Sequence, residues 1–521
     1  MKNVREYVCL LLLAACGSDA GCPTGFTRVG TVCIEAPDAA MPDMGDAGDM
    51  NVEDAPTDAA DAADAADEQL ACEPMSADCD DDGTCETTLG TRSACLACDD
   101  ACEFGEACRD TGCAEPDVSL RGFPFFPLQL AVMNDGDMVA AGIFTAPTDF
   151  GDGEVSPLGE TDAALVRYAP NGDVRWAKTY GGAGLNVVFS ALATNGNDLF
   201  VGIALDGDIS FDGVTAAGPE RPAVGRWSGS GDAAWVETGP PGTSTITAIA
   251  VNDDGVFAFE QGDTSHRVLR RRLDSGDAFA APLTLALGEL NGLARPWIEP
   301  VVSDDFALSV VVEAGADFGE GAVAEGGGFV ARFTDGSLAW VHAATGDVGQ
   351  IGRLPDGFVV ASAIATEDGD IEMITGTIER LSDAGAVLWS RASESAGADG
   401  LAFLDATADA SGILVVGFFR ETATFDGQSF TSTPAERGEF PREQDIFVAR
   451  LNTSDGSLAW ALTFANGQFV APAFPGSLAT RNGRTFVETG FRGEWTVGGD
   501  TIVEVGEPGL FGFPAALTID E

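Results

Sequence analysis

A phrase of four short apolar runs recurs from about residue 120 to the end of the chain. Its second run reads MVAAGIF at 138–144 and ILVVGFF at 413–419. Its third and fourth runs read AALVRYAPNGDVRW at 163–176 and IFVARLNTSDGSLAW at 446–460. Each run has the length of a strand and is bounded by Asn, Asp or Gly turns, which is the pattern of strands joined by hairpins. The repeat therefore predicts a series of four-stranded units.

Seven copies of the second run can be counted, and radial repetition of four-stranded antiparallel units is typical of a β-propeller. The prediction is an all-β chain whose main domain is a seven-bladed propeller. A large aromatic residue recurs in the fourth run, where burial between blades would contribute a few kcal/mol per side chain at about 25 cal/mol per Å². These residues are Trp176, Trp235, Phe279, Trp340, Trp389 and Trp460.

The seventh unit stops at its third run, FPAALTIDE, residues 513–521. A sheet ending there would leave its backbone groups unpaired at one edge. The segment VSLRGFPF, residues 118–125, is strand-like and belongs to no earlier unit. We expect it to supply the outer strand of the last blade, antiparallel to Ala515–Ile519, and so to join the two ends of the ring.

Two phrases resemble the SBBP-type bacterial β-propeller repeat. They are DAALVRYAPNGDVRWAKTYGG at 162–182 and QDIFVARLNTSDGSLAWALTF at 444–464. The third unit departs from the pattern, with Phe279 in place of Trp. The resemblance implies a propeller on an exported or surface protein, and it implies no catalytic residues.

The first residues, MKNVREYVCLLLLAAC, have a basic start and a short apolar run, the layout of a signal peptide over residues 1–15. The end of this stretch resembles the lipobox of bacterial lipoproteins. That resemblance implies cleavage before Cys16, lipidation of its sulfur and acylation of its new amine, which together anchor a protein stably. Gly17 then favours the outer membrane. An ordinary signal peptide with an incidental Cys16 is the alternative.

Two segments follow the anchor. Residues 16–36 form a small unit in which Cys22 and Cys33 are expected to pair, because disulfides persist in exported proteins. Residues 37–71 are mostly Asp, Ala and Pro. Such a composition buries too little apolar surface to fold, so we expect a disordered linker that acts as a spacer.

Residues 72–116 form a cysteine-rich module. In a cytosolic chain its Cys95-x-x-Cys98 motif would suggest zinc or a redox pair. Export favours disulfides, since so short a segment has too little core of its own. The pairing stays open among Cys72, Cys79, Cys85, Cys95, Cys98, Cys102, Cys108 and Cys113.

Net charge and the few histidines restrict the partners and the catalytic sites that can be expected. The formal net charge is −56, so phosphate repulsion excludes nucleic acid as an expected partner. The two histidines, His266 and His342, stand in different units and are interpreted as surface or rim residues. Glu299, Arg353 and Asp405 fall on expected inner strands, where they could form either an acid–base site or salt pairs.

Acidic turns and one basic cluster leave alternatives open. The turns DFGDGE at 149–154, ISFDG at 209–213 and DCDDDGTCET at 78–87 contain carboxylates that suit calcium, although Asp-Gly is above all a turn pair. We expect no bound metal or cofactor, with calcium as the alternative. The cluster at 270–272, Arg-Arg-Arg, is expected to serve an internal acidic neighbour, or else an anionic ligand.

The expected protein is lipid-anchored in the cell outer membrane, periplasmic or surface-exposed, with its propeller at residues 117–521. The propeller is interpreted as a binding module for a protein or glycan ligand and not as an enzyme, since function resides in the loops of such folds. A propeller enzyme acting on polysaccharide or peptide, and a structural envelope component, are the alternatives.

Overall fold

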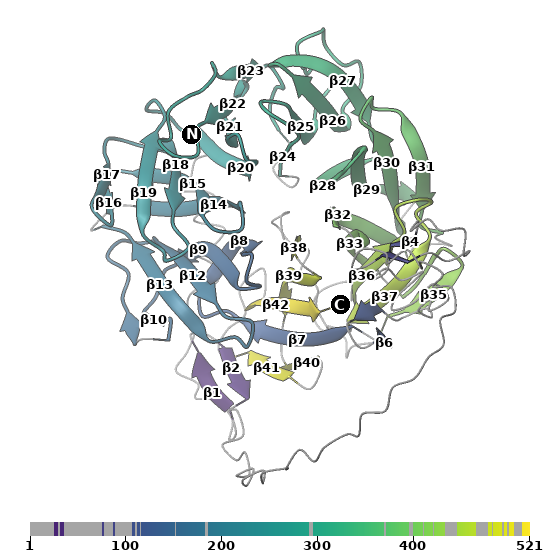
Figure 1. The fold of residues 1–521 in the computed structure, drawn as a ribbon, viewed down its shortest axis with the longest axis horizontal. Helices are drawn as coiled ribbons and strands as arrows, with labels where there is room; N and C mark the ends of the chain where they lie inside the picture. Colours follow the sequence, from purple (N-terminus) through teal and green to yellow (C-terminus); the bar gives the residue numbers. More distant parts are fainter. Residues whose placement is uncertain are drawn as a thin grey trace, which may run out of the picture.

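The computed structural model is all-β and has the form of a closed ring (Figure 1). It describes six strand segments before residue 115 and most of residues 116–520. The gaps in that range are 152, 183–185, 291–294, 369–370, 395–399, 410, 420, 433–444, 465–477, 482, 492–493, 498–499 and 505–512. The described part contains no helix long and apolar enough to cross a membrane.

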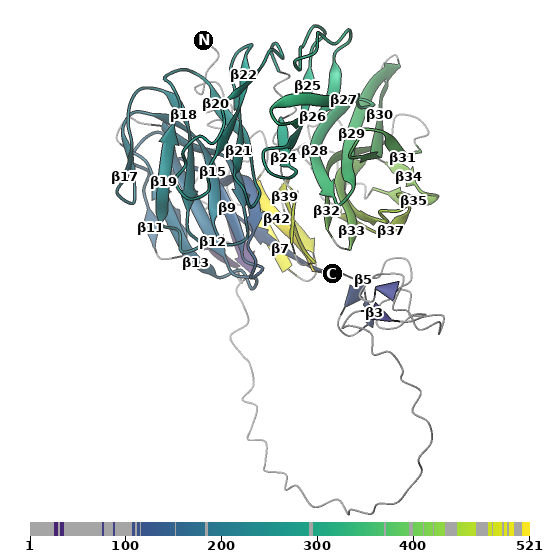
Figure 2. The same ribbon diagram turned by 45° about the horizontal axis from the view of Figure 1, so that its top comes forward.

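Seven four-stranded antiparallel sheets form the ring, as the repeat predicts (Figures 1 and 2). Blade 1 contains, from the inside outward, β8 (Phe126–Val132), β9 (Met138–Phe144), β12 (Asp162–Tyr168) and β13 (Val174–Tyr180). Blade 2 contains β14 (Asn186–Thr194), β15 (Leu199–Asp206), β18 (Arg221–Trp227) and β19 (Ala233–Thr238). Blade 3 contains β20 (Thr245–Val251), β21 (Val256–Gln261), β22 (His266–Arg271) and β23 (Leu283–Leu285).

The second half of the ring repeats the same order. Blade 4 contains β24 (Trp297–Pro300), β25 (Phe306–Val312), β26 (Gly327–Thr334) and β27 (Ser337–Ala343). Blade 5 contains β28 (Asp347–Leu354), β29 (Gly357–Asp368), β30 (Ile371–Ser382) and β31 (Val387–Ala392). Blade 6 contains β32 (Leu401–Asp409), β33 (Gly412–Phe419), β36 (Asp445–Leu451) and β37 (Leu458–Phe464). Blade 7 contains β38 (Leu478–Arg481), β39 (Arg484–Phe491), β42 (Phe513–Asp520) and β7 (Asp117–Gly122).

Small hairpins extend the links between second and third strands. They are β10–β11 (Thr148–Asp149, Glu154–Val155), β16–β17 (Ile209–Phe211, Val214–Ala216), β34–β35 (Thr422–Phe425, Gln428–Thr431) and β40–β41 (Glu494–Val497, Asp500–Glu504). The core lies between blades, and the second strands β9 and β33 are buried at every residue. Such strands read as continuous apolar runs because both of their faces are covered.

An arginine–tryptophan pair connects each of four blades to the next. Arg167 of β12 lies opposite Trp176 of β13, and both donate hydrogen bonds to the carbonyl oxygen of Gly229 in blade 2, at 2.7 and 3.0 Å. The same arrangement recurs for Arg226 and Trp235 on Leu273, Arg332 and Trp340 on Asp383, and Arg380 and Trp389 on Thr453. The expectation that the recurrent aromatic residue fills the joint is confirmed for these four tryptophans, and the arginine is an additional component.

The turn glycines explain how the tryptophan fits. Gly231 lies beneath the Trp176 ring, where an added Cβ would meet ring atoms at 3.0 Å, and its φ of +86° already disfavours other residues.

The joint between blades 3 and 4 differs. Phe279 precedes β23, and its N–H donates to the carbonyl of Arg270. The guanidinium of Arg270 approaches Gly336 of blade 4, the place that a tryptophan occupies elsewhere.

The two ends of the ring are joined by β7. It pairs antiparallel with β42 in the register Val118↔Ile519 to Gly122↔Ala515, which confirms the expected closure. Leu120 of β7 is buried in the core that blade 7 shares with blade 6. The guanidinium of Arg121 lies 4.4 Å from the ring centre of Tyr168 in blade 1 and replaces the tryptophan contact there. Backbone pairing therefore closes a ring whose last joint lacks the repeated side-chain pair.

The segment before the propeller is described only at short strands. They are β1 (Phe26–Val29), β2 (Val32–Glu35), β3 (Ser76–Ala77), β4 (Thr87–Thr88), β5 (Ala107–Arg109) and β6 (Gly112–Ala114). The signal peptide at 1–15, Cys16 and the linker at 37–71 lie outside the described residues. So do Cys22, Cys72, Cys79, Cys85, Cys95, Cys98 and Cys102. Cys33 lies on β2, and Cys108 and Cys113 lie opposite each other across β5–β6.

Candidate functional site

The seven inner strands surround the centre of the ring and can be compared level by level (Figure 1). One level is defined by the residues that share a strand register with the third-strand arginines. In blades 1 to 6 its members are Ala131, Ala193, Ala250, Glu299, Gly352 and Thr407. Small residues suit a position where seven strands converge. Glu299 is the single charged side chain at this level.

The level two residues earlier is polar on one side of the ring. In blades 1 to 6 its members are Gln129, Ala191, Ala248, Trp297, Gln350 and Asp405. Three of the four non-aliphatic members belong to the consecutive blades 4, 5 and 6. We call the set Trp297, Glu299, Gln350, Arg353 and Asp405 the inner arc. The sequence predicted three of its members, and equivalent register adds Trp297 and Gln350.

A β-bulge sets the local shape of the inner strands. The register shifts just before the polar level in β8, β14, β20, β28 and β32. A bulge leaves backbone groups unpaired and redirects a side chain, which is why bulges often lie next to sites. In β28 the N–H of Gln350 donates to Asp405 Oδ1 at 2.8 Å, and Ser309 Oγ donates to the Gly349 carbonyl at 2.7 Å. Asp405 therefore holds the bulge of the neighbouring blade.

Two polar groups of the inner arc, the Gln350 side chain and the Trp297 indole Nε1, are left incompletely bonded among the described residues. Gln350 is the more informative of the two. Its side chain is 6% exposed, and its Oε1 accepts no hydrogen bond from the described residues. An unpartnered buried acceptor costs about 1–3 kcal/mol, so such groups are rare unless something binds them. Thr247 Oγ1, on the bulge of β20, is in the same condition.

Glu299 is partly exposed, and burial raises its pKa to about 8. The Trp297 indole and the charge of Arg353 oppose that rise without overcoming it. Arg353 is engaged elsewhere: it donates to Asp383 Oδ1 and to the Gly357 carbonyl, both at 2.7 Å. The structure thus brings Glu299 and Arg353 together, as one alternative proposed, but the raised pKa favours the protonated form of Glu299 near neutral pH.

A second carboxyl with similar properties was missed by the sequence reasoning. Glu488 lies on β39, where burial raises its pKa to about 8 and the charge of Arg295 opposes the rise. Its Oε2 accepts no hydrogen bond from the described residues. The run TFVETGF at 485–491 places this Glu within an otherwise apolar and small second strand, and that misfit is the one signal that could have identified it.

Both histidines make contacts that stabilise the propeller, within blade 3 for His266 and between blades 4 and 5 for His342. His266 is fully buried and stacks on Phe259, its Nε2 lies 2.8 Å from the Gly288 carbonyl oxygen, and burial lowers its pKa. The interpretation of His266 as a surface or rim residue is therefore wrong, because the apolar neighbours of β22 enclose it. His342 is partly buried and lies 3.0 Å from Glu379 Oε2 across the joint between blades 4 and 5.

The acidic turns are occupied by donors of the protein. Asp149 Oδ1 accepts the backbone N–H groups of Gly151 and Gly153 at 2.8 and 3.1 Å. Asp212 accepts the hydroxyl of Tyr180 at 2.7 Å and the N–H of Ala233 at 3.3 Å. These contacts favour the turn interpretation over calcium. The acidic turn before β4 lies outside the described residues.

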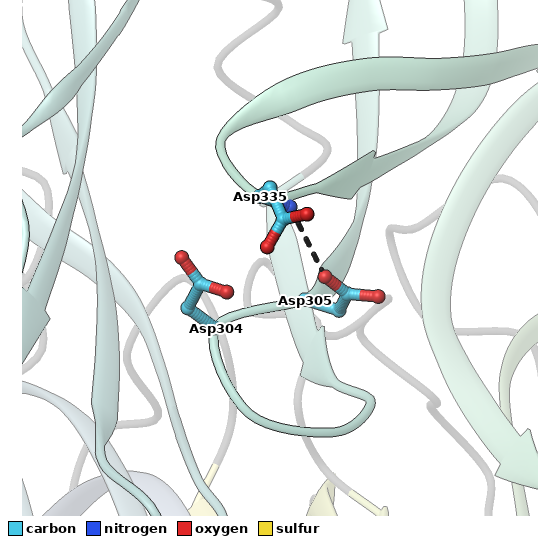
Figure 3. Close-up of side chains that lie close together, drawn as sticks. All are labelled: Asp304, Asp305 and Asp335. Carbon is cyan, nitrogen blue, oxygen red and sulfur yellow. Dashed lines mark hydrogen bonds between the residues drawn. The ribbon is translucent and has the colours of Figure 1, made fainter.

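Three carboxylates approach one another on blade 4, from Asp304, Asp305 and Asp335 (Figure 3). Arg270 donates to Asp304 at 3.0 Å, which confirms the expected internal acidic neighbour of the basic cluster. Arg332 lies 3.5 Å from Asp305. Asp305 also accepts the N–H of Asp335 at 3.2 Å. Two arginines thus compensate this cluster as part of the joints on either side of blade 4.

Comparison with known proteins places the chain in no family. No family model matches it, so the SBBP-type resemblance stays a prediction, and no curated protein matches it. Solved structures similar to it include the quinohemoprotein alcohol dehydrogenase from Comamonas testosteroni, at 9% identity and a TM-score of 0.32, covering 77% of this chain and 76% of that one. The polysaccharide lyase Uly1 has 9% identity and a TM-score of 0.33, covering 76% and 90%. Saccharomyces cerevisiae Sqt1 has 10% identity and a TM-score of 0.31, covering 67% and 100%. Similarities this weak do not assign an activity.

Proposed function

We propose that this chain is a lipid-anchored protein of the cell outer membrane whose propeller binds a glycan at the inner arc without chemical turnover. The observation that carries the binding proposal is the buried, unpartnered Oε1 of Gln350 among polar groups gathered from three consecutive blades. The inner strands of blades 1 to 3 carry mainly alanines at the same two levels.

The residues of the inner arc fit sugar hydroxyl groups. A protonated Glu299 can donate and accept a hydrogen bond, and the Gln350 carbonyl can accept one. The Trp297 ring supplies an apolar face with a polar edge, a combination that suits amphipathic ligands. The high pKa of Glu299 favours a neutral polar ligand over a cation, because a cation would require the charged carboxylate.

The proposed location rests on the amino-terminal sequence LAAC at residues 13–16. Lipidation of Cys16 would hold the mature chain on the membrane, in the periplasm or at the cell surface. The test is Cys16→Ala, which should leave the protein exported but extractable without detergent. If the variant still partitions with membranes as the parent does, the anchor is wrong.

Binding is tested by calorimetry of the full chain carrying Cys16→Ala against a panel of envelope and extracellular glycans. For a glycan that binds, Gln350→Leu and Trp297→Ala should each weaken the affinity about tenfold or more, the effect of losing 1.4 kcal/mol. Gln261→Leu, on the second strand of blade 3, is the matched control and should leave the affinity unchanged. Binding that is insensitive to both inner-arc variants, or found only with peptides, would refute the proposal.

The raised pKa of Glu299 also suits a general acid, since an efficient one titrates near the working pH. This observation favours an enzyme acting on polysaccharide as the second candidate. Release of reducing ends from a bound glycan, abolished by Glu299→Gln while binding persists, would decide for the enzyme.

A further inference from the structure

A hairpin from the amino-terminal part of the chain completes the extra sheet on blade 7. Strand β2 pairs antiparallel with β41, in the register Val32↔Glu504, Cys33↔Val503 and Ile34↔Ile502. The resulting sheet has the order β1-β2-β41-β40. Figure 1 shows its four strands together beside β7. The small unit that follows the proposed anchor is thus seated on the propeller.

The β40–β41 hairpin is suited to accept a strand. A two-stranded hairpin is at best marginally stable, and its open edge invites pairing. Ile502 is 1% exposed and Val497 is 9% exposed, in a core shared with Leu120 of the closing strand. The corresponding hairpins β10–β11, β16–β17 and β34–β35 stay two-stranded among the described residues. The addition is therefore particular to blade 7.

We propose that the β41 edge is the docking site of the amino-terminal hairpin Phe26–Glu35, and that this docking holds blade 7 close to the membrane. Residues 36–116 then start at β2 and end at β7, so both of their ends lie on blade 7, where β41 contacts β7. The membrane part of the proposal rests on the proposed lipid anchor at Cys16, whereas the docking does not.

The number of residues between Cys16 and the propeller depends on whether the hairpin is docked, and this number sets how far the propeller can lie from the membrane. Only residues 17–25 separate Cys16 from β1, and they reach at most about 32 Å at roughly 3.5 Å per residue. Without docking, residues 17–116 would form the tether, with a root-mean-square span of roughly 50–60 Å and an extended reach several times larger. Docking therefore replaces the spacer role that the sequence predicts for residues 37–71.

The docking is tested by cross-linking in the full chain with Cys16→Ala and a protease site inserted between residues 60 and 61. Antiparallel partners lie about 4.5–5.5 Å apart at Cα, within the range that a disulfide spans. The pair Ile34→Cys and Ile502→Cys should keep the cleaved amino-terminal fragment covalently attached under non-reducing conditions. The pair Ile34→Cys and Ser210→Cys, on the equivalent hairpin of blade 2, should release it.

Because Ile502 is buried, the pair Val32→Cys and Glu504→Cys repeats the test at a second register position. Release of the fragment from both pairs to the same extent as from the control pair would overturn the docking. This outcome is independent of lipidation, since these variants lack Cys16.

The membrane distance is tested with the lipidated chain on vesicles that contain a headgroup-labelled acceptor lipid. A donor at Thr496, exposed on β40, should transfer energy several-fold more efficiently than a donor at Ser275, exposed on the blade 3 turn. Val32→Pro with Ile34→Pro should abolish that difference. Equal transfer from the two donors in the parent would refute the short tether, whereas failure of the parent to bind vesicles would refute the anchor.

Discussion

Deleting Asp117–Gly122 from the full chain should open the ring. The deletion removes the outer strand of blade 7 and the burial of Leu120, which is worth about 2 kcal/mol. It also removes about six backbone hydrogen bonds at roughly 1 kcal/mol each, and the contact of Arg121 with Tyr168, worth about 1 kcal/mol. The expected loss is about 9 kcal/mol, comparable with the total stability of a typical domain.

Differential scanning calorimetry converts that loss into a temperature. Unfolding entropy near 2.1 cal/mol/K per residue gives about 0.85 kcal/mol/K for a propeller of some 400 residues, so the melting temperature should fall by roughly 10 °C. Leu120→Ala alone should lower it by a few degrees. A synthetic peptide with the sequence DVSLRGFPF should recover part of the loss by pairing with the free edge. A deletion variant that melts within 2 °C of the parent would refute the view that β7 closes the ring.

Three further predictions concern a joint, a titration and a disulfide. Trp340→Ala should destabilise the propeller by about 3–5 kcal/mol in denaturant unfolding. Trp340→Phe should cost much less, because phenylalanine keeps an aromatic ring in the joint and the Arg332 donor still serves the Asp383 carbonyl. The folded pKa of Glu299, about 8, lies above its ordinary value of 4.5. This group therefore favours the folded state below pH 4.5 and loses that contribution as the pH rises to 8. Glu299→Gln should flatten the decline of melting temperature over this range, and an unchanged slope would contradict the raised pKa. Cys108 and Cys113 should form a disulfide, since they are opposite partners in the β5–β6 register, and peptide mapping without reduction that finds either thiol free would contradict it.

The fold was predictable because the repeat contains nearly all of its information. Strand length, turn residues and the recurrent tryptophan are local signals, and they identified the seven blades and the closing strand before any contact was known. The arginine opposite each tryptophan was visible in AALVRY and IFVARL, yet its role depends on a carbonyl of the next blade. Contacts between repeats cannot be inferred from the pattern inside one repeat.

The inner arc was predictable only in part. Glu299, Arg353 and Asp405 were noted as charges on inner strands, but their roles depend on a bulge that shifts the alternation of side chains by one residue. Asp405 therefore accepts a backbone N–H of blade 5 instead of joining Glu299. Glu488 escaped notice because it lies on a second strand, where only the three-dimensional arrangement brings it near Arg295.

The repeat also provides a way to separate structure from function within the ring. Where several units agree, the shared feature has a structural task, as the arginine–tryptophan pairs of blades 1, 2, 4 and 5 show. Where one unit departs at a level that the others fill with small residues, packing does not require the departure. Glu299 among alanines, a glycine and a threonine is such a case, and so is the addition of β1 and β2 to the β40–β41 hairpin of blade 7. A carboxyl whose pKa is raised by burial and a half-bonded glutamine both cost stability, so the departures at blades 4 and 5 support the proposal that a ligand binds there.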